Sequence, residues 1–373
     1  MTRKPRQIHL KYAEKRDVVF FFGAGASVAA GIPLQEDILR EALSQSRVRD
    51  SQAGRELIRF LQRFFALNRR LYPMPSLEDV FAFLDYFISR NEHLDSVYSV
   101  SQLRKIQECF VRIIHYTIGQ RRTNNASTHR AFWDVVGVTN RNVSIVSLNY
   151  DSVLEAAFGL YPEHAYIDYC INLLNYDYEE VPAFYWWINP REPVPRFGEE
   201  NPVPIKILKL HGSLDWKFCR ACRGVLLTPW STEIDLEQGA FFSPPGDDIL
   251  PSELLCPVDG CRFETLILPP SYIKDLRNPV VSTIGSEIEQ EIRIAKKVVL
   301  IGYSLPDADI HLRALFAKSL SRDTQVVVVN PDNCDALQAR YACLAQRVSF
   351  LNHTFESFVL SESLGDILKG TGA

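Results

Sequence analysis

The sequence predicts an α/β fold, in which a doubly wound parallel sheet carries a helical insertion and a second insertion containing paired cysteines. Two observations support this fold class. Five apolar runs rich in Val, Ile and Phe each end in small or polar residues, as parallel strands buried on both faces do. Between the first and second runs, the apolar period changes from that of strands to that of helices.

The first run, Val18 to Phe22, leads directly into Gly23-Ala-Gly-Ala-Ser27. Small residues allow a tight turn and a close approach to a ligand, and we expect a helix to follow whose N-terminal N–H groups favour a phosphate. The spacing differs from the dehydrogenase G-x-G-x-x-G, because position 28 is Val and the third glycine is Gly31. A purely structural strand–helix turn is the alternative interpretation.

The helical insertion is predicted at residues 50–125. Three apolar stripes with helical spacing lie between about Glu56 and Gly119. The stripes run over Leu57–Phe65, Leu77–Ile88 and Leu103–Ile114. Stripes of this kind form a packed core, so we expect no chemistry from this module.

After Gly137 the strand pattern returns, and each strand ends at a polar or small residue. Val143–Leu148 precedes Asn149, Pro202–Leu210 precedes His211, Lys297–Ile301 precedes Gly302, and Gln325–Val329 precedes Asn330. Open parallel sheets bind ligands in the crevice beyond the carboxyl ends of their strands. The five junctions therefore predict one shared site.

These residues, in this order, resemble the sirtuin family of NAD-consuming domains. The matching pieces are Gly23–Ser27 with Gly31-Ile-Pro33, Leu148-Asn-Tyr-Asp151, Leu210-His-Gly-Ser213, Gly302-Tyr-Ser304 and Asn330. The second and fourth of these motifs, at Leu148–Asp151 and Gly302–Ser304, are similar to those of bacterial sirtuin-like defence proteins. The resemblance implies a Rossmann-like sirtuin core that extends over residues 1–373.

The resemblance also implies roles for individual residues. Gly23, Ala24, Gly25 and Ser27 would cradle the NAD+ pyrophosphate, and Gly302, Ser304 and Asn330 would hold the adenosine half. Asn149 would bind the nicotinamide ribose or the attacking water, and His211 would be the general base. Asp151 would orient these groups, or would instead cap the helix that follows it.

The implied chemistry is cleavage of the nicotinamide–ribose bond of NAD+. Deacylases continue Gly-Ile-Pro with Asp-Phe-Arg, whereas Leu34-Gln35-Glu36 follows here, and Leu148 stands where a Gln is usual. Both departures favour water as the acceptor, and hence an NAD+ glycohydrolase. The resemblance to bacterial defence proteins implies that it acts as the effector of a prokaryotic antiviral response. The alternatives are an NAD-dependent protein deacylase or ADP-ribosyltransferase, and a nucleotide sensor with little turnover.

A second insertion, at residues 212–265, is predicted to be a zinc ribbon. Cys219-x-x-Cys222 and Cys256-x-x-x-x-Cys261 are two close pairs of the kind that supplies four thiolates to a structural Zn²⁺. Deacylating sirtuins carry such a ribbon in this region, so this feature favours the deacylase alternative. Four unrelated buried thiols are the other interpretation.

Composition sets limits on partners and location. The chain has 373 residues and a net charge of −4, which gives no reason to expect nucleic acid or an anionic membrane as a partner. No hydrophobic signal core or membrane-spanning stretch is present in the sequence, so a cytoplasmic location is expected. By analogy with the family, we expect a homo-oligomer and a HerA-type ATPase as a candidate partner.

Overall fold

The structure is a computed structural model. It describes residues 6–67, 74–121, 126–158, 165–174, 187–189, 192–196, 201–228, 233–242, 253–272, 274 and 276–370. The chain divides into two compact units. The first unit comprises residues 1–31, 124–212 and 276–373, and the second comprises residues 32–123 and 213–275.

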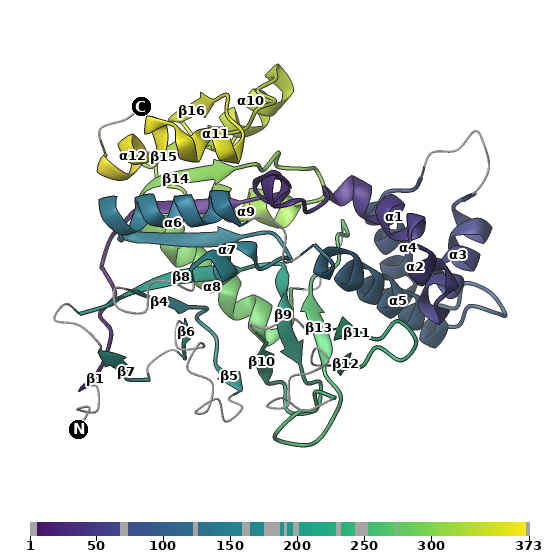
Figure 1. The fold of residues 1–373 in the computed structure, drawn as a ribbon. Helices are drawn as coiled ribbons and strands as arrows, with labels where there is room; N and C mark the ends of the chain where they lie inside the picture. Colours follow the sequence, from purple (N-terminus) through teal and green to yellow (C-terminus); the bar gives the residue numbers. More distant parts are fainter. Residues whose placement is uncertain are drawn as a thin grey trace. The chain divides into compact units, whose positions relative to one another are not determined.

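The first unit is built on an eight-stranded sheet in the order β16-β15-β14-β2-β3-β8-β4-β6 (Figure 1). All of its neighbouring strands pair in parallel. The strands are β2 (Arg16–Phe22), β3 (Val143–Ser147), β4 (Ala165–Asp168), β6 (Trp187–Ile188), β8 (Val203–Lys209), β14 (Ala295–Ile301), β15 (Gln325–Val329) and β16 (Val348–Leu351). The predicted parallel sheet is therefore confirmed. The chain moves outward from β2 in both directions, which makes the end of β2 the switch point of the sheet.

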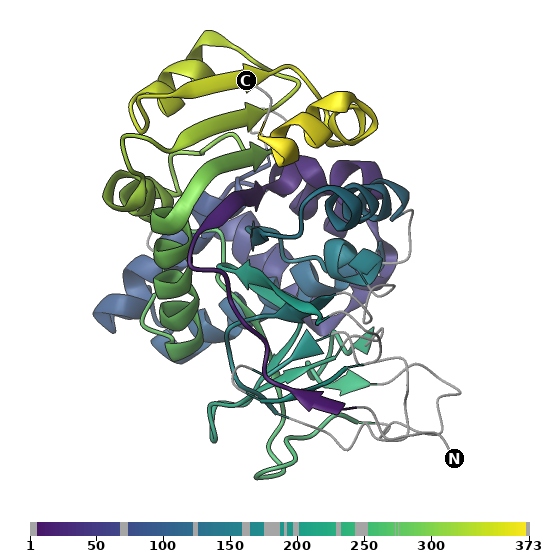
Figure 2. The same cartoon turned by 90° about the vertical axis from the view of Figure 1, so that its left-hand side faces the viewer.

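Helices cover both faces of this sheet. Along β2, Phe20 and Phe22 pack edge-on against Phe132 of α6, whereas Phe21 packs against Phe316 of α9. Because successive strand residues point to opposite faces, α6 and α9 lie on opposite sides of the sheet (Figure 2). The helices of this unit are α6 (Ser127–Thr139), α7 (Val153–Phe158), α8 (Pro279–Ile294), α9 (Ile310–Ser319), α10 (Asp335–Ala342), α11 (Phe355–Leu360) and α12 (Glu362–Lys369). The remaining strands of this unit are β1 (Arg6–Ile8), β5 (Leu173–Leu174) and β7 (Val194–Arg196), of which β1 and β7 pair antiparallel.

One local prediction in this unit is wrong. No continuous helix follows the glycine turn; the chain makes two 3-10 turns, η1 (Ala24–Ala26) and η2 (Val28–Ala30). Gly31 ends the second turn in the left-handed conformation, with φ of 80°. Pro33 and the extended Leu34 separate this turn from the next helix, which begins at Gln35. The segment directly after Gly23 is therefore 3-10 helix rather than α-helix.

The second unit contains a helical module and small antiparallel pairings. Its helices are α1 (Gln35–Ser44), α2 (Ser46–Asp50), α3 (Gln52–Phe64), α4 (Leu77–Arg90) and α5 (Val100–Gly119). The three predicted stripes are confirmed as the buried faces of α3, α4 and α5. Its strands are β9 (Gly212–Phe218), β10 (Val225–Leu227), β11 (Glu233–Ile234), β12 (Phe241–Phe242) and β13 (Glu264–Ile267). Strand β9 pairs antiparallel with β10, and β11 pairs antiparallel with β12.

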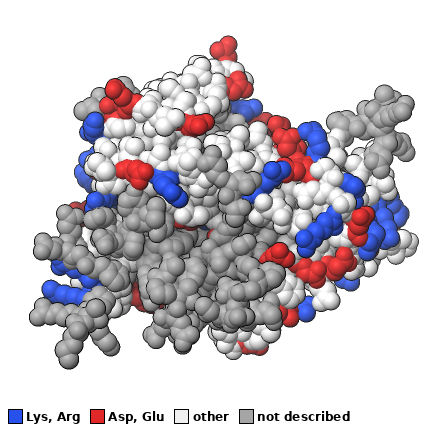
Figure 3. Space-filling view, in the orientation of Figure 1, with Lys and Arg blue, Asp and Glu red and all other residues white. Residues whose placement is uncertain are grey.

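Charged side chains of both signs lie on the surface of the protein. On the face shown in Figure 3, the described Lys and Arg side chains are interspersed with Asp and Glu. Among the described residues, no helix has the length and apolar character needed to cross a bilayer.

Candidate functional site

Two glycine turns meet at the switch point of the sheet. Gly23 and Gly25 follow β2, and Gly302 follows the neighbouring β14; the amide of Gly25 donates to the carbonyl of Gly302 at 2.9 Å. A Cβ added at Gly302, which has φ of 60°, would lie 2.4 Å from the amide nitrogen of Ala26. A Cβ at Gly23 would lie 2.6 Å from the Gly302 carbonyl oxygen. The glycines therefore let two backbone turns pack directly against each other.

The backbone amides of the first turn are mostly committed to the protein. Gly23 donates to Ile301, Gly25 to Gly302, Ala26 to Gly23 and Ser27 to Ala24, at 2.9 to 3.1 Å. These donors are used within the protein because the turn coils into a 3-10 helix and packs on the Gly302 turn. The expected cradle, in which these N–H groups hold a pyrophosphate, stays a prediction.

Asn149 is held rigidly just after β3. Its Nδ2 donates to the Gly23 carbonyl and to the Ser27 hydroxyl, both at 2.9 Å. The Ser27 hydroxyl in turn donates to Asp151 Oδ2 at 2.8 Å. Since both amide hydrogens of Asn149 are used, its Oδ1 is the atom with which the half-buried side chain can accept a further hydrogen bond. The structure thus brings three predicted site residues into one network.

Asp151 makes contacts that fit both of the roles considered for it. Its Oδ1 accepts from the amide of Val153, the first residue of α7, at 3.2 Å, while its Oδ2 accepts from Ser27. Its own carbonyl accepts from the fully buried Lys209 Nζ, which also pairs with Glu155 at 2.8 Å. Asp151 is therefore a positioning residue that connects the start of α7 to the glycine turn.

His211 follows β8, the neighbour of β3, and is 7% exposed. Its Nδ1 lies 3.1 Å from the carbonyl oxygen of Leu148, the residue before Asn149. A carbonyl only accepts, so Nδ1 carries the hydrogen and the neutral ring presents its lone pair at Nε2. That Nε2 lies 3.1 Å from Nε2 of His311.

His311 and Asp309 belong to this cluster, and sequence reasoning missed them. They lie at the start of α9, and one ligand atom from each, together with one from His211, lie within 4.8 Å of one another. The Tyr303 hydroxyl donates to Asp309 Oδ2 at 2.7 Å, and burial together with this carboxylate raises the pKa of Tyr303. The signal in the sequence was Asp309-x-His311, placed shortly after the Gly302 strand end.

Ser304 and Asn330, the residues expected to hold the adenosine half of NAD+, form hydrogen bonds outside the network of Asn149 and His211. Ser304 is exposed, and its carbonyl accepts from Arg340 at 3.2 Å. Asn330 Oδ1 closes a local turn by accepting from the amide of Asp332 at 2.9 Å. The structure places both at strand ends of the same sheet edge, but neither is bonded to Asn149 or His211 by a described contact.

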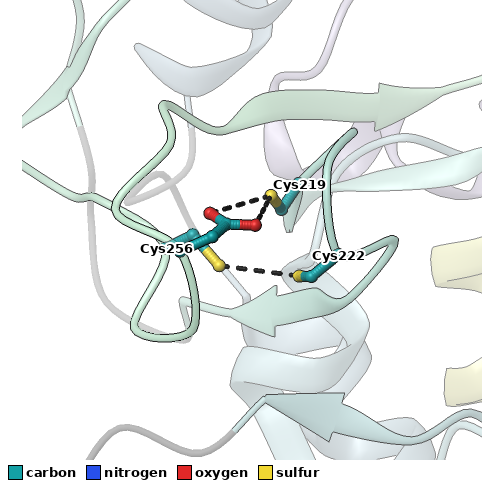
Figure 4. A group of neighbouring side chains, drawn as sticks. Cys219, Cys222 and Cys256 are labelled. Carbon is teal, nitrogen blue, oxygen red and sulfur yellow. Dashed lines mark hydrogen bonds between the residues drawn. The ribbon is translucent and has the colours of Figure 1, made fainter.

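The second unit holds a cluster of sulfur atoms. Cys219, Cys222 and Cys256 point toward one another from two loops (Figure 4). The sulfur atoms of Cys222 and Cys256 lie 3.6 Å apart, close to the spacing of about 3.8 Å that a tetrahedral Zn²⁺ with Zn–S bonds of about 2.3 Å requires. The amide of Gly224 points at Cys222 Sγ at 3.3 Å, as in a knuckle turn. Three donors of the predicted set therefore fit a zinc ion.

The fourth donor differs from the sequence prediction. Asp259, an exposed residue, is the fourth member of the cluster and lies 3.3 Å from Cys219 Sγ, whereas Cys261 is not part of the group. Both the amide and the thiol of Cys261 interact with Asp259, and this contact raises the pKa of the Cys261 thiol. The spacing Cys256-x-x-Asp259 repeats that of the first pair, which is the signal that could have found it.

Of three comparisons with known proteins, the one with solved structures found similar chains. No protein-family model matches the chain, and neither does any curated protein. Among solved structures, a Sir2 homolog–NAD complex is 14% identical and has a TM-score of 0.43, with 98% of this chain and 96% of that chain covered. Sir2 bound to an acetylated peptide is 13% identical at a TM-score of 0.43, with coverages of 96% and 95%.

Proposed function

We propose that the protein hydrolyses NAD+ to ADP-ribose and nicotinamide at the carboxyl edge of its parallel sheet. One observation carries this proposal: Asn149 is fixed through both amide hydrogens to the glycine turn, which leaves Oδ1 as an acceptor beside the strand end that bears His211. An oriented acceptor and a base at a switch point suit the activation of water or of a ribose hydroxyl.

The reaction breaks the bond between the ribose C1′ and the nicotinamide nitrogen. The electron pair of that bond stays on the nicotinamide ring, which becomes neutral, and positive charge develops on the ribose. Water adds to C1′ and loses a proton, so that NAD+ and water give ADP-ribose, nicotinamide and a proton. In this scheme Asn149 Oδ1 accepts from the attacking water or from a ribose hydroxyl and fixes its position.

His211 is the proposed base, and its Nε2 is the atom that takes the proton. The hydrogen bond from Nδ1 to the Leu148 carbonyl fixes this tautomer. The water or hydroxyl replaces His311 as the partner of Nε2. Because four backbone amides of the glycine turn are already bonded, Gly23, Ala24, Gly25 and Ser27 would contact the cofactor mainly by van der Waals approach. Gly302, Ser304 and Asn330 remain our proposed contacts to the adenosine half.

The second candidate is an NAD-dependent protein deacylase or ADP-ribosyltransferase. The cysteine cluster favours it, because the resemblance ties a zinc ribbon to deacylating sirtuins. We propose that Cys219, Cys222 and Cys256, with Asp259 as the fourth donor, hold a structural Zn²⁺ in either case. The replacement of the deacylase aromatic and cation by Gln35 and Glu36 favours hydrolysis.

The test is to incubate the purified chain with NAD+ alone and to separate the products by chromatography. Hydrolysis predicts equal amounts of nicotinamide and ADP-ribose, and no change in rate when an acyl-lysine peptide is added. His211→Ala should lower the rate by roughly 10²–10⁴-fold. Consumption of NAD+ that requires the peptide and yields a deacylated product would establish the alternative.

The biological setting is also a proposal, and the sequence resemblance supports it. We propose that the protein acts in the cytoplasm as the effector of a prokaryotic antiviral response, as a homo-oligomer, with a HerA-type ATPase as a candidate partner. Light scattering of the purified chain tests the oligomer. Co-expression with a HerA-type ATPase tests whether such a partner raises NAD+ consumption.

A further inference from the structure

We propose that His211, His311 and Asp309 form a binding site for a divalent transition-metal ion, separate from the cysteine cluster. The two imidazoles face each other through Nε2, at 3.1 Å, with ring centroids 5.3 Å apart. The carboxylate of Asp309 completes a group whose three ligand atoms lie within 4.8 Å of one another. All three residues lie in the first unit.

The spacing of the donors suits a small cation. Two imidazole nitrogens bound to Zn²⁺ at about 2.0–2.1 Å, with tetrahedral angles, lie about 3.3 Å apart. The observed 3.1 Å is close to this separation. The ligand atom of Asp309 lies within 4.8 Å of both histidine ligand atoms, so an ion between the two rings would lie near this carboxylate.

Neighbouring groups orient two of the three ligands as metal sites require. A metal-bound histidine usually donates its other ring N–H to a carbonyl, and His211 Nδ1 faces the Leu148 carbonyl. The Tyr303 hydroxyl holds the Asp309 carboxylate from the opposite side. His211 and Asp309 are 7% and 6% exposed, so the donors are fixed rather than solvated.

The donor set indicates which ions would bind. Two imidazole nitrogens and one carboxylate oxygen suit Zn²⁺, Co²⁺ and similar ions, whereas Mg²⁺ and Ca²⁺ prefer oxygen ligands only. Three protein ligands leave a coordination position for water.

Binding of an ion would have one consequence for catalysis, and this consequence rests on the proposed function. The ion would use His211 Nε2, which is the same atom that the proposed base needs. Metal binding and base catalysis would then exclude each other, and added Zn²⁺ would inhibit NAD+ hydrolysis. The binding itself does not depend on that activity.

The test uses the full chain, without a histidine tag and with zinc loaded at the cysteine cluster, titrated with Co²⁺. Cobalt bound by nitrogen and oxygen gives visible absorption bands without the near-ultraviolet band of thiolate ligation. We expect this spectrum to saturate at one added Co²⁺ per chain. His311→Gln should weaken binding by at least about tenfold. His353→Gln, at a histidine before α11 that contacts Ser357, is the matched control and should bind as the wild type does.

The proposal is overturned if the wild type gives no such spectrum, or if folded His311→Gln and Asp309→Asn bind Co²⁺ as tightly as the wild type. If His311→Gln does not fold, Asp309→Asn decides, because Asn can still accept from Tyr303. Failure of NAD+ hydrolysis leaves these spectra unchanged, so the two proposals are judged separately.

Discussion

The side-chain nitrogen of Asn149 lies 2.9 Å from the Ser27 hydroxyl oxygen, and that hydroxyl donates to Asp151 at 2.8 Å. The chain of bonds links the residue after β3 to the turn after β2. Its direction is fixed, because the amide can only donate through Nδ2 and the carboxylate can only accept. The acceptor oxygen of Asn149 is therefore held by the fold before any ligand binds.

The first prediction concerns this network. Asn149→Asp keeps the size of the side chain but removes both donated hydrogen bonds, and it places a carboxylate against the Gly23 carbonyl. We expect NAD+ turnover to fall by roughly 10²–10⁴-fold, and stability to fall by about 1–3 kcal/mol. Thermal unfolding and chromatographic rate assays measure the two effects.

Ser27→Ala separates the contribution of the bond between Asn149 and Gly23 from that of the link to Asp151. This variant keeps the bond from Asn149 to Gly23 but removes the link to Asp151. Its turnover should lie between the wild type and Asn149→Asp. Wild-type turnover in folded Asn149→Asp would remove Asn149 from the proposed mechanism.

The second prediction concerns the contact between the glycine turns. Gly302→Ala introduces a Cβ 2.4 Å from the Ala26 amide nitrogen at a residue with φ of 60°, so backbone must shift. We expect the free energy of unfolding to fall by about 1–3 kcal/mol. Gly365→Ala in α12 is the matched control, because nothing lies within 4 Å of its added Cβ. It should be neutral or stabilise by up to about 1 kcal/mol. Equal unfolding midpoints for the two variants would contradict the close packing of the turns.

The sequence predicted the strands well because each is an unbroken apolar run, such as Val18–Phe22, whose burial dominates its conformation. It also placed Asn149 and His211 at neighbouring strand ends. It failed directly after Ser27, where small residues suit either a helix or 3-10 turns. Gly31 in the left-handed conformation and Pro33 two residues later favour 3-10 turns over a continuous α-helix.

Contacts between distant residues could not be predicted in the same way. His311 lies 100 positions from His211, and only the pairing of β14 beside β2 brings α9 to the site. Asp259 was overlooked for a different reason. A second cysteine, Cys261, was close enough in sequence to complete the expected pair, and only the folded loop shows that Asp259 lies with the three sulfur atoms.

The third prediction is a pH dependence of stability. Burial lowers the pKa of His129 from 6.5 to about 4, while the Asp151 carboxylate acts in the opposite direction. Between these values the unfolded chain binds a proton that the folded chain does not, so stability falls as the pH falls from 6.5 to about 4. We expect this group to contribute about 1–3 kcal/mol to that loss.

The check compares unfolding midpoints across this range for wild type, His129→Gln and the control His353→Gln. His129→Gln should show a shallower loss on acidification, whereas the control should follow the wild type. Parallel curves for all three proteins would mean that His129 does not titrate as its burial requires.

The last prediction concerns the fourth donor of the cysteine cluster. The cysteine cluster of the purified protein should hold about one Zn²⁺ per chain, and Cys219→Ser should lose that ion. Because Asp259 is the fourth member of the cluster, Asp259→Ala should weaken zinc retention against a chelator, while Cys261→Ser should retain zinc as the wild type does. Metal analysis after dialysis measures both. The opposite ranking would mean that zinc draws Cys261 inward past Gly260 and displaces the carboxylate, since a thiolate is the softer ligand. Equal loss from both variants would show that the two side chains act together, with Asp259 accepting from the Cys261 amide and thereby orienting its sulfur.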